Sequence, residues 1–159
     1  MEERSVTHST FVIERKYAAA PERVFAAFAD PAMKRRWYLD AGGRDVESYD
    51  LEFGAGGWER ARFRLPAGTP VAGMVCTNDG VHLEIVPDRR VVMASTMTIG
   101  ERCISASLIT IEISPAGAGT ELIFTHQGAF FAGADGPAMR EAGWRTLLER
   151  LGIDLAGGA

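Results

Sequence analysis

The stretch "ERKYAAAPERVFAAFADPAMKRRWY", residues 14–38, changes from strand-like to helical periodicity and decides how the fold begins. Its first residues complete a strand that we expect from Thr10 to Ala18, and Pro21 suits the first position of a helix. Asp30-Pro31 ends that helix, and a second short helix is predicted over "AMKRRWY". The first helix has an apolar face formed by Val24, Phe25, Ala27 and Phe28.

Beyond this stretch the apolar residues alternate with a period of two, which predicts strands. Turn signals separate most of these strands, and Asn78-Asp79-Gly80 is a signal for a tight turn. Consecutive strands joined by short turns must be antiparallel. We expect the strands near residues 45–53, 57–65, 71–77, 80–87, 90–98, 102–114 and 119–127.

The segment "EAGWRTLLERL", residues 141–151, predicts a long C-terminal helix that starts at Asp135-Gly136-Pro137. Met139, Gly143 and Leu147 recur every four residues, so they share the face that should point into the core. A glycine inside a helix costs about 1 kcal/mol relative to alanine. We therefore expect that either another backbone approaches closely at Gly143 or a cavity occupies this space.

The predicted order is one strand, two helices, a run of strands and one long helix, which indicates an α+β protein. A curved antiparallel sheet needs one face covered, and the C-terminal helix is the obvious cover. We expect a helix-grip fold in which the sheet wraps around this helix and leaves a cavity beside Gly143. The whole chain, residues 1–159, is predicted to form one domain with an ordered core over about residues 10–153.

Composition narrows the classes of function. The chain is 47% hydrophobic and 24% charged, which is typical of a globular protein. Its net charge of -4 argues against nucleic acid as a partner, because binding phosphates requires a basic face. No apolar run approaches the ~18 residues of a membrane span. The polar N-terminus lacks the apolar run of a secretory signal, so we expect a cytoplasmic location.

The sequence contains no pattern that predicts a metal or a nucleotide cofactor, and we expect neither. His8, His82 and His126 form no His-x-x-x-His pair, and no Cys-x-x-Cys occurs. His82 has the parity of the outer face of its strand and is predicted to lie at the surface. Cys76 and Cys103 are expected to be reduced thiols, as is usual in the cytoplasm.

Several blocks together resemble the START-like (SRPBCC) superfamily, in the branch related to the activator of the heat-shock protein 90 ATPase. Residues 14–38 resemble the opening of that branch, and "GGWERARF", "EIVPDRRVV", "GTELIFTHQGAF" and "GWRTLLERL" resemble later blocks in the same order. The resemblance covers about residues 10–153 and implies a helix-grip fold with an internal pocket. Its members include ligand carriers and polyketide cyclases, so the fold does not fix the function. Many relatives carry an acidic residue where this chain has His126.

Two polar side chains are candidates for chemistry inside the pocket. Glu59 shares a side of its strand with Ala61 and Phe63, which places it inside or, alternatively, at the rim in water. His126 shares a side with Leu122 and Phe124 and should point inward at the end of its strand. A histidine can act as acid, base or hydrogen-bond donor near neutral pH, although a lone histidine is more often only a hydrogen-bonded polar residue.

Aromatic and flexible apolar residues are candidates for the wall of the pocket, although core filling is the simpler explanation for some of them. Phe130 and Phe131 lie in "GAFFAGADG", which we expect to be a loop that could act as a lid. The other predicted wall residues are Trp37, Tyr38, Phe63, Met93, Met97, Phe124, Gly143, Trp144 and Leu147.

Three functions follow in order of preference. The first is a binding protein for a small hydrophobic or aromatic molecule, lipid-like or polyketide-like, held between the sheet and the C-terminal helix. The second is an enzyme of the cyclase, hydrolase or isomerase kind that uses His126 and Glu59 as acid and base. The third is a co-chaperone, ranked last because we expect no additional N-terminal module. A homodimer is compatible with each of them.

Overall fold

The computed structural model describes residues 6–157 of the chain. A short 3-10 helix, η1, follows the second α-helix. The elements are β1 (Thr7–Tyr17), α1 (Pro21–Ala29), α2 (Pro31–Tyr38), η1 (Asp40–Gly42), β2 (Asp45–Leu51), β3 (Trp58–Arg64), β4 (Val75–Val86), β5 (Arg90–Ile99), β6 (Arg102–Ala116), β7 (Gly119–Phe130) and α3 (Pro137–Gly157).

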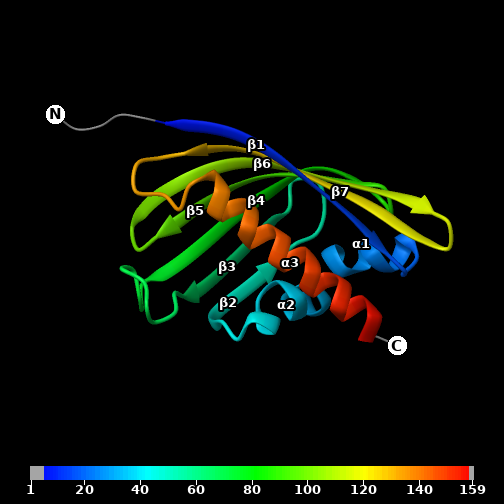
Figure 1. Cartoon of the computed structure of the whole chain (residues 1–159), viewed down its shortest axis with the longest axis horizontal. Helices are drawn as coiled ribbons and strands as arrows, with labels where there is room; N and C mark the ends of the chain where they lie inside the picture. Colours follow the sequence, from blue (N-terminus) through cyan, green and yellow to red (C-terminus); the bar gives the residue numbers. More distant parts are fainter. Residues whose placement is uncertain (1–5, 158–159) are drawn as a thin grey trace.

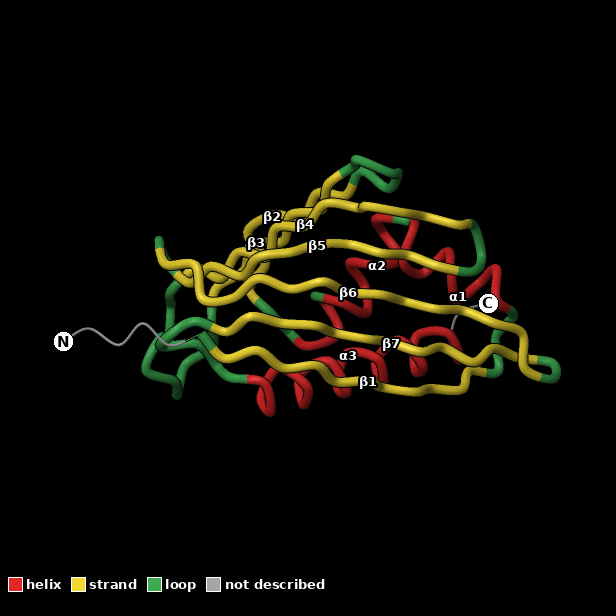
Figure 2. Tube along the Cα trace, turned by 90° about the horizontal axis from the view of Figure 1, so that it is seen from above, coloured by secondary structure: helices red, strands yellow, loops and turns green. Residues whose placement is uncertain are grey.

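The strands form one seven-stranded sheet in the order β1-β7-β6-β5-β4-β3-β2, and all neighbours are antiparallel. The sheet is curved, and α3 runs along its concave face (Figure 1). Figure 2 shows that α1 and α2 lie on the same side of the sheet as α3. The predicted α+β helix-grip fold is therefore confirmed.

The junction of α1 and α2 depends on one aspartate and two prolines. Pro21 and Pro31 each occupy the start of a helix, where the missing N–H group is not needed. The side chain of Asp30 caps α2 by accepting a hydrogen bond from the backbone N–H of Met33 at 3.0 Å. Two short helices after the first strand were predicted, and both are present.

The tight turn predicted at Asn78-Asp79-Gly80 is wrong, because these residues lie inside the continuous strand β4. Asp79 points to the outer face and accepts a hydrogen bond from Arg60 Nε at 2.6 Å. Gly80 lies under the methyl group of Met93, which occupies the space that a side chain would need. Residues with the composition of a turn therefore have other roles here. Asp79 pairs with a side chain of the neighbouring strand, and Gly80 allows the close approach of Met93.

The predicted surface position of His82 is also wrong, because its side chain is buried. His82 is 2% exposed, whereas its neighbours Val81 and Leu83 point outward and are 44% and 55% exposed. Its Nδ1 atom lies 3.1 Å from the carbonyl oxygen of Gly57. The sequence misleads here because the outer face of β4 carries apolar residues and the inner face carries a polar one.

The core lies between the inner face of the sheet and the helices, and its centre includes Ile13, Leu122, Leu148 and Leu151. Tyr17 connects β1 to α3, since its hydroxyl donates a hydrogen bond to the carbonyl oxygen of Leu148 at 2.8 Å. Both cysteines are free thiols, as predicted. Among the helices of residues 6–157, none is both long and apolar enough to cross a lipid bilayer.

Candidate functional site

A cavity of about 720 Å³ lies between the inner face of the sheet and the first half of α3. Its mouth is bordered by exposed residues of the β3–β4 loop and of the β7–α3 loop. Figure 1 shows both loops at the same end of the molecule. The predicted wall residues that line this cavity are Tyr38, Phe63, Met93, Met97, Gly143, Trp144 and Leu147.

Gly143 faces this cavity and not a neighbouring backbone. A methyl group at Gly143 would meet no atom within 4 Å outside its own turn of helix. The close approach of α3 to the sheet occurs instead at Gly152, where a methyl group would lie 3.1 Å from the ring of Tyr17. Of the two explanations for a glycine on the inner face of α3, the cavity is the one that applies to Gly143.

Four predicted wall residues lie outside the lining of the cavity. Trp37 is fully buried in the core, where its indole N–H donates to the carbonyl oxygen of Ala27 at 2.9 Å. Phe124 is also fully buried and lies behind Trp144, with 4.4 Å between the ring centres. The aromatic residues predicted for the wall are therefore divided between the core and the cavity, and the sequence does not distinguish these two positions.

The predicted phenylalanine lid is wrong for Phe130, which is the last residue of β7 and is only 3% exposed. The backbone N–H of Phe131 bonds to the carbonyl oxygen of Ile104 at 2.9 Å, which continues the β6–β7 pairing by one residue. The side chain of Phe131 is half-buried and lies outside the lining. The mouth is bordered instead by the small residues Gly133 and Ala134 of the same loop.

His126 places a polar atom without a partner in the wall of the cavity. The side chain is 1% exposed, and its Nδ1 is the single buried side-chain N or O atom of the described residues without a hydrogen-bond partner. The ring stacks on Phe11, with 4.7 Å between the centres. Burial, assisted by the positive charge of Arg140, lowers the pKa of His126 to about 4, so the ring is neutral at pH 7.

Arg140 forms a buried polar cluster at the start of α3. Its guanidinium binds both carboxylate oxygens of Asp135 at 2.9 and 2.8 Å and donates to Ser105 Oγ at 3.0 Å. The same group lies 5.1 Å from the centre of the Phe130 ring. Arg140 was not predicted from the sequence, although its position three residues before Gly143 places it on the same face of the helix.

Glu59 points inward, as its strand parity predicted, and the alternative of a rim position in water is wrong. The side chain is only 6% exposed, and both of its carboxylate oxygens have hydrogen-bond partners. Lys34 Nζ lies 2.8 Å from one oxygen and 2.7 Å from the other. The hydroxyl of Tyr49 also donates to the carboxylate, and burial together with Glu59 raises the pKa of Tyr49.

Glu59 and His126 border the same cavity but do not form a pair. The charges that act on the pKa of His126 are those of Arg140 and Asp135. Glu59 instead belongs to a cluster with Lys34, Tyr49 and Tyr38, and burial followed by the charge of Glu59 raises the pKa of Tyr38. The arrangement gives the cavity two separate buried polar clusters, one around Glu59 and one around Arg140.

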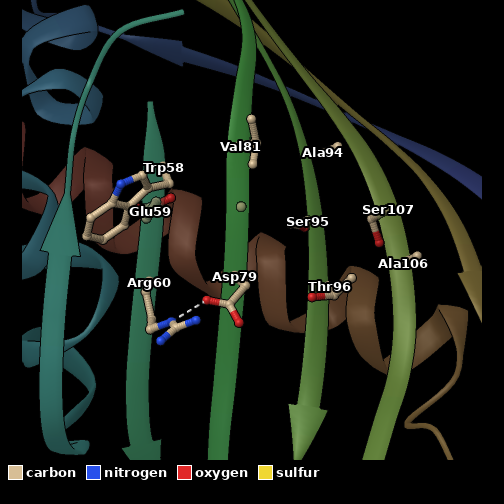
Figure 3. A pocket seen from close by; sticks show the side chains of 11 residues that line it. Trp58, Glu59, Arg60, Asp79, Val81, Ala94, Ser95, Thr96, Ala106 and Ser107 are labelled. Carbon is tan, nitrogen blue, oxygen red and sulfur yellow. Dashed lines mark hydrogen bonds and ion pairs between the residues drawn. The ribbon is translucent and has the colours of Figure 1, made fainter. Parts of the chain in front are cut away.

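A second hollow, of about 600 Å³, lies on the outer face of the sheet with α3 behind the strands (Figure 3). Trp58 and Val81 border it and are 47% and 44% exposed, and the ion pair of Arg60 with Asp79 lies beside them. His126, which carries the buried polar atom without a partner, borders the inner cavity and not this hollow. Within residues 6–157, no cluster of side chains could hold a metal ion.

A curved antiparallel sheet that wraps around a C-terminal helix and encloses a cavity defines a START-like, helix-grip protein. The chain belongs to the family described as Activator of Hsp90 ATPase homolog 1-like protein, which residues 18–153 match. This confirms the resemblance found in the sequence.

Two solved structures are similar in sequence as well as in fold. The Mll3558 protein from Rhizobium loti is 45% identical, with a TM-score of 0.84 over 94% of this chain and 99% of that one. A putative uncharacterized protein from Rhizobium leguminosarum is 35% identical, with a TM-score of 0.88 over 98% of this chain and 99% of that one. No curated protein sequence matches the chain closely enough to count as a relative.

Proposed function

We propose that the protein binds a small, mainly apolar molecule in the cavity between the sheet and α3. The observation that carries this proposal is the inner cavity itself, which leaves open the space at Gly143 that a larger residue would fill. Its volume of about 720 Å³ falls within the range of ~300–1,000 Å³ typical of small-molecule sites. A START-like fold is compatible with a ligand-binding domain.

The wall supports a ligand that also carries one hydrogen-bonding group. A buried polar atom without a partner costs about 1–3 kcal/mol, and His126 Nδ1 is such an atom in the ligand-free protein. A hydroxyl or carbonyl group on a bound molecule would satisfy this atom, because a neutral imidazole can offer a donor at one nitrogen and an acceptor at the other. The rest of the ligand would contact apolar residues such as Met93, Trp144 and Leu147.

The acid–base alternative lacks comparable support, because Glu59 is held by Lys34 and Tyr49 and does not act on His126. A general base must lie within bonding reach of the proton that it removes and must be free to accept it. We therefore keep ligand binding as the proposed function and assign no reaction to the cavity.

The replacement of Gly143 by leucine tests this proposal. A leucine at this position would extend into the cavity and should reduce the affinity for the fluorescent probe N-phenylnaphthylamine by about tenfold or more. The melting temperature should not fall, because leucine favours a helix over glycine by nearly 1 kcal/mol.

Ala142→Leu is the matched control, since Ala142 is the exposed neighbour on α3 and lies outside the cavity lining. It should bind the probe as the wild type does. Unchanged probe binding in Gly143→Leu, combined with a large loss of stability, would mean that the glycine serves packing and that the proposal is wrong.

A further inference from the structure

The charged side chains in the wall of the cavity are paired, with one exception. Lys34 is bound to Glu59, and Arg140 is bound to Asp135. A fifth charged residue, Asp79, borders the cavity from the outer face of β4 and pairs there with an arginine of β3. Each acidic residue of the wall therefore already has its cation.

The exception is Arg44, which lies just before β2 at the mouth of the cavity. Its guanidinium carbon lies 4.4 Å from the centre of the Phe63 ring, and the side chain is half-buried. Within residues 6–157, no carboxylate forms an ion pair with Arg44. The cavity consequently has an excess of one positive charge, carried by a planar group that lies on an aromatic ring.

The charge of Arg44 acts on the interior of the cavity. Burial raises the pKa of the Cys76 thiol to about 11, and the positive charge of Arg44 opposes this rise. Arg44 likewise opposes the rise in the pKa of Tyr38, which burial and, after it, the negative charge of Glu59 cause. Cys76 lines the cavity, and the charges that act most strongly on it are those of Arg44 and Arg140, so an anion between Cys76 and Arg44 would lie in a positive potential.

A second observation points to a ligand in the same cavity. His126 Nδ1 is buried, lacks a partner and belongs to the cavity wall, as described above. A guanidinium group matches the geometry of a carboxylate, because its N–H groups can bind both oxygens. A single excess charge also suits a carboxylate better than a phosphate, which carries up to two negative charges.

We infer that the ligand is an amphipathic carboxylate, with an apolar body in the cavity and its carboxylate on Arg44 at the mouth. This inference rests on the proposed function, since it assigns a chemical class to the ligand of the same cavity. The apolar body extends from Phe63 toward Met93 and Met97, and a polar atom of that body reaches His126.

The inference can be tested by displacement of N-phenylnaphthylamine, a neutral probe, with decanoate and with decanol at about pH 7.5, where the acid is ionised. The two competitors have the same chain and differ in charge. Wild-type protein should bind decanoate about tenfold more tightly than decanol, because a charge-assisted hydrogen bond contributes more than a neutral one. The preference should weaken as salt is added.

Arg44→Gln should reduce the ratio of the two affinities to about one, and Arg44→Lys should keep part of it because the charge remains. Arg62→Gln is the matched control, since Arg62 lies on the outer face of β3 and should leave the ratio unchanged. Circular dichroism would establish that each variant is folded.

The outcomes separate this inference from the proposed function. If the neutral probe binds and decanol displaces it as well as decanoate does, the carboxylate assignment is wrong while the cavity still binds ligands. If Arg62→Gln lowers the ratio as much as Arg44→Gln does, the preference reflects net charge and the role of Arg44 is overturned. If the neutral probe does not bind at all, the proposed function fails and this inference fails with it.

Discussion

His126 is a polar side chain in a position where the surrounding rings favour an apolar one. Its ring lies between Phe11, at 4.7 Å, and Phe130, at 6.0 Å between centres. A phenylalanine at this position would leave no unpartnered nitrogen. The imidazole therefore costs stability in the ligand-free protein, which is expected of a residue that serves binding.

The titration of His126 follows from this environment. Because burial lowers its pKa to about 4, the unfolded chain binds a proton that the native protein does not bind between pH ~6.5 and ~4. The titration of this residue thus leaves the free energy of unfolding unchanged above pH ~6.5 and lowers it progressively as the pH falls toward 4. We expect NMR of the ring protons to give a pKa near 4 in the wild type and in Glu59→Gln.

Repeating this titration in Glu59→Gln tests the alternative that His126 and Glu59 act together as acid and base. Lys34 and Tyr49 bind the Glu59 carboxylate, and Glu59 is not among the charges that act on the pKa of His126. If the pKa of His126 falls by about one unit or more in Glu59→Gln, the two groups are coupled and the separation of Glu59 from His126 described here is wrong.

Strand parity predicted the orientation of Glu59 and His126, because a two-residue period fixes which side chains share a face. The same reasoning could not tell whether Trp37 fills the core or lines a cavity, since both uses need an aromatic residue. Arg44 and Arg140 were not predicted, because an arginine in sequence gives no indication that its charge is buried, paired or unpaired.

At the scale of elements, the Lys34–Glu59 pair connects α2 to β3 across the interior. Both side chains are nearly inaccessible, at 5% and 6% exposure. Lys34 also lies 5.0 Å from the centre of the Tyr38 ring, so the cation has two kinds of partner. Removal of one member would leave the other charge buried without compensation.

Lys34→Met should therefore lower the free energy of unfolding by roughly 3 kcal/mol or more, since it leaves the Glu59 carboxylate buried and unpaired. The double variant Lys34→Met/Glu59→Gln should recover much of this loss, because no buried charge remains. Urea denaturation of both variants at neutral pH measures the two values.

An exposed pair of the same kind provides the control. Arg35→Met removes the partner of Asp40, and both of those side chains are largely exposed, so its cost should stay within about 1 kcal/mol. If Lys34→Met costs no more than Arg35→Met, the pair does not connect the two elements in the way described here.

The order of elements was predictable because periodicity, capping and proline positions agree along most of the chain. Pro21, Asp30 and Pro31 define the two helices by local chemistry alone. The prediction failed within β4, where Asn78-Asp79-Gly80 has the composition of a turn but pairs with β3 and β5 on either side. Such tertiary pairing overrides a local preference.

At the scale of the whole molecule, the curved sheet and α3 enclose a space that neither layer fills. The concave face carries the core at one end, around Leu148 and Leu151, and the cavity at the other, beside Gly143. The glycines of α3 reflect this division, since Gly152 contacts Tyr17 and Gly143 faces open space. One helix thus serves packing in its second half and the cavity wall in its first.

The proposed binding site is this inner cavity and not the hollow on the outer face. NMR of isotope-labelled methionine methyl groups and tryptophan side chains during titration with N-phenylnaphthylamine distinguishes these two locations. Met93 and Met97 line the cavity, Met33 packs on the core outside it, and Trp58 borders the outer hollow. We predict saturable shifts of the Met93 and Met97 methyl signals from the aromatic probe, with Met33 and the Trp58 indole unchanged. Shifts at Trp58 without any change at Met93 and Met97 would contradict the account and would place the binding site on the outer face.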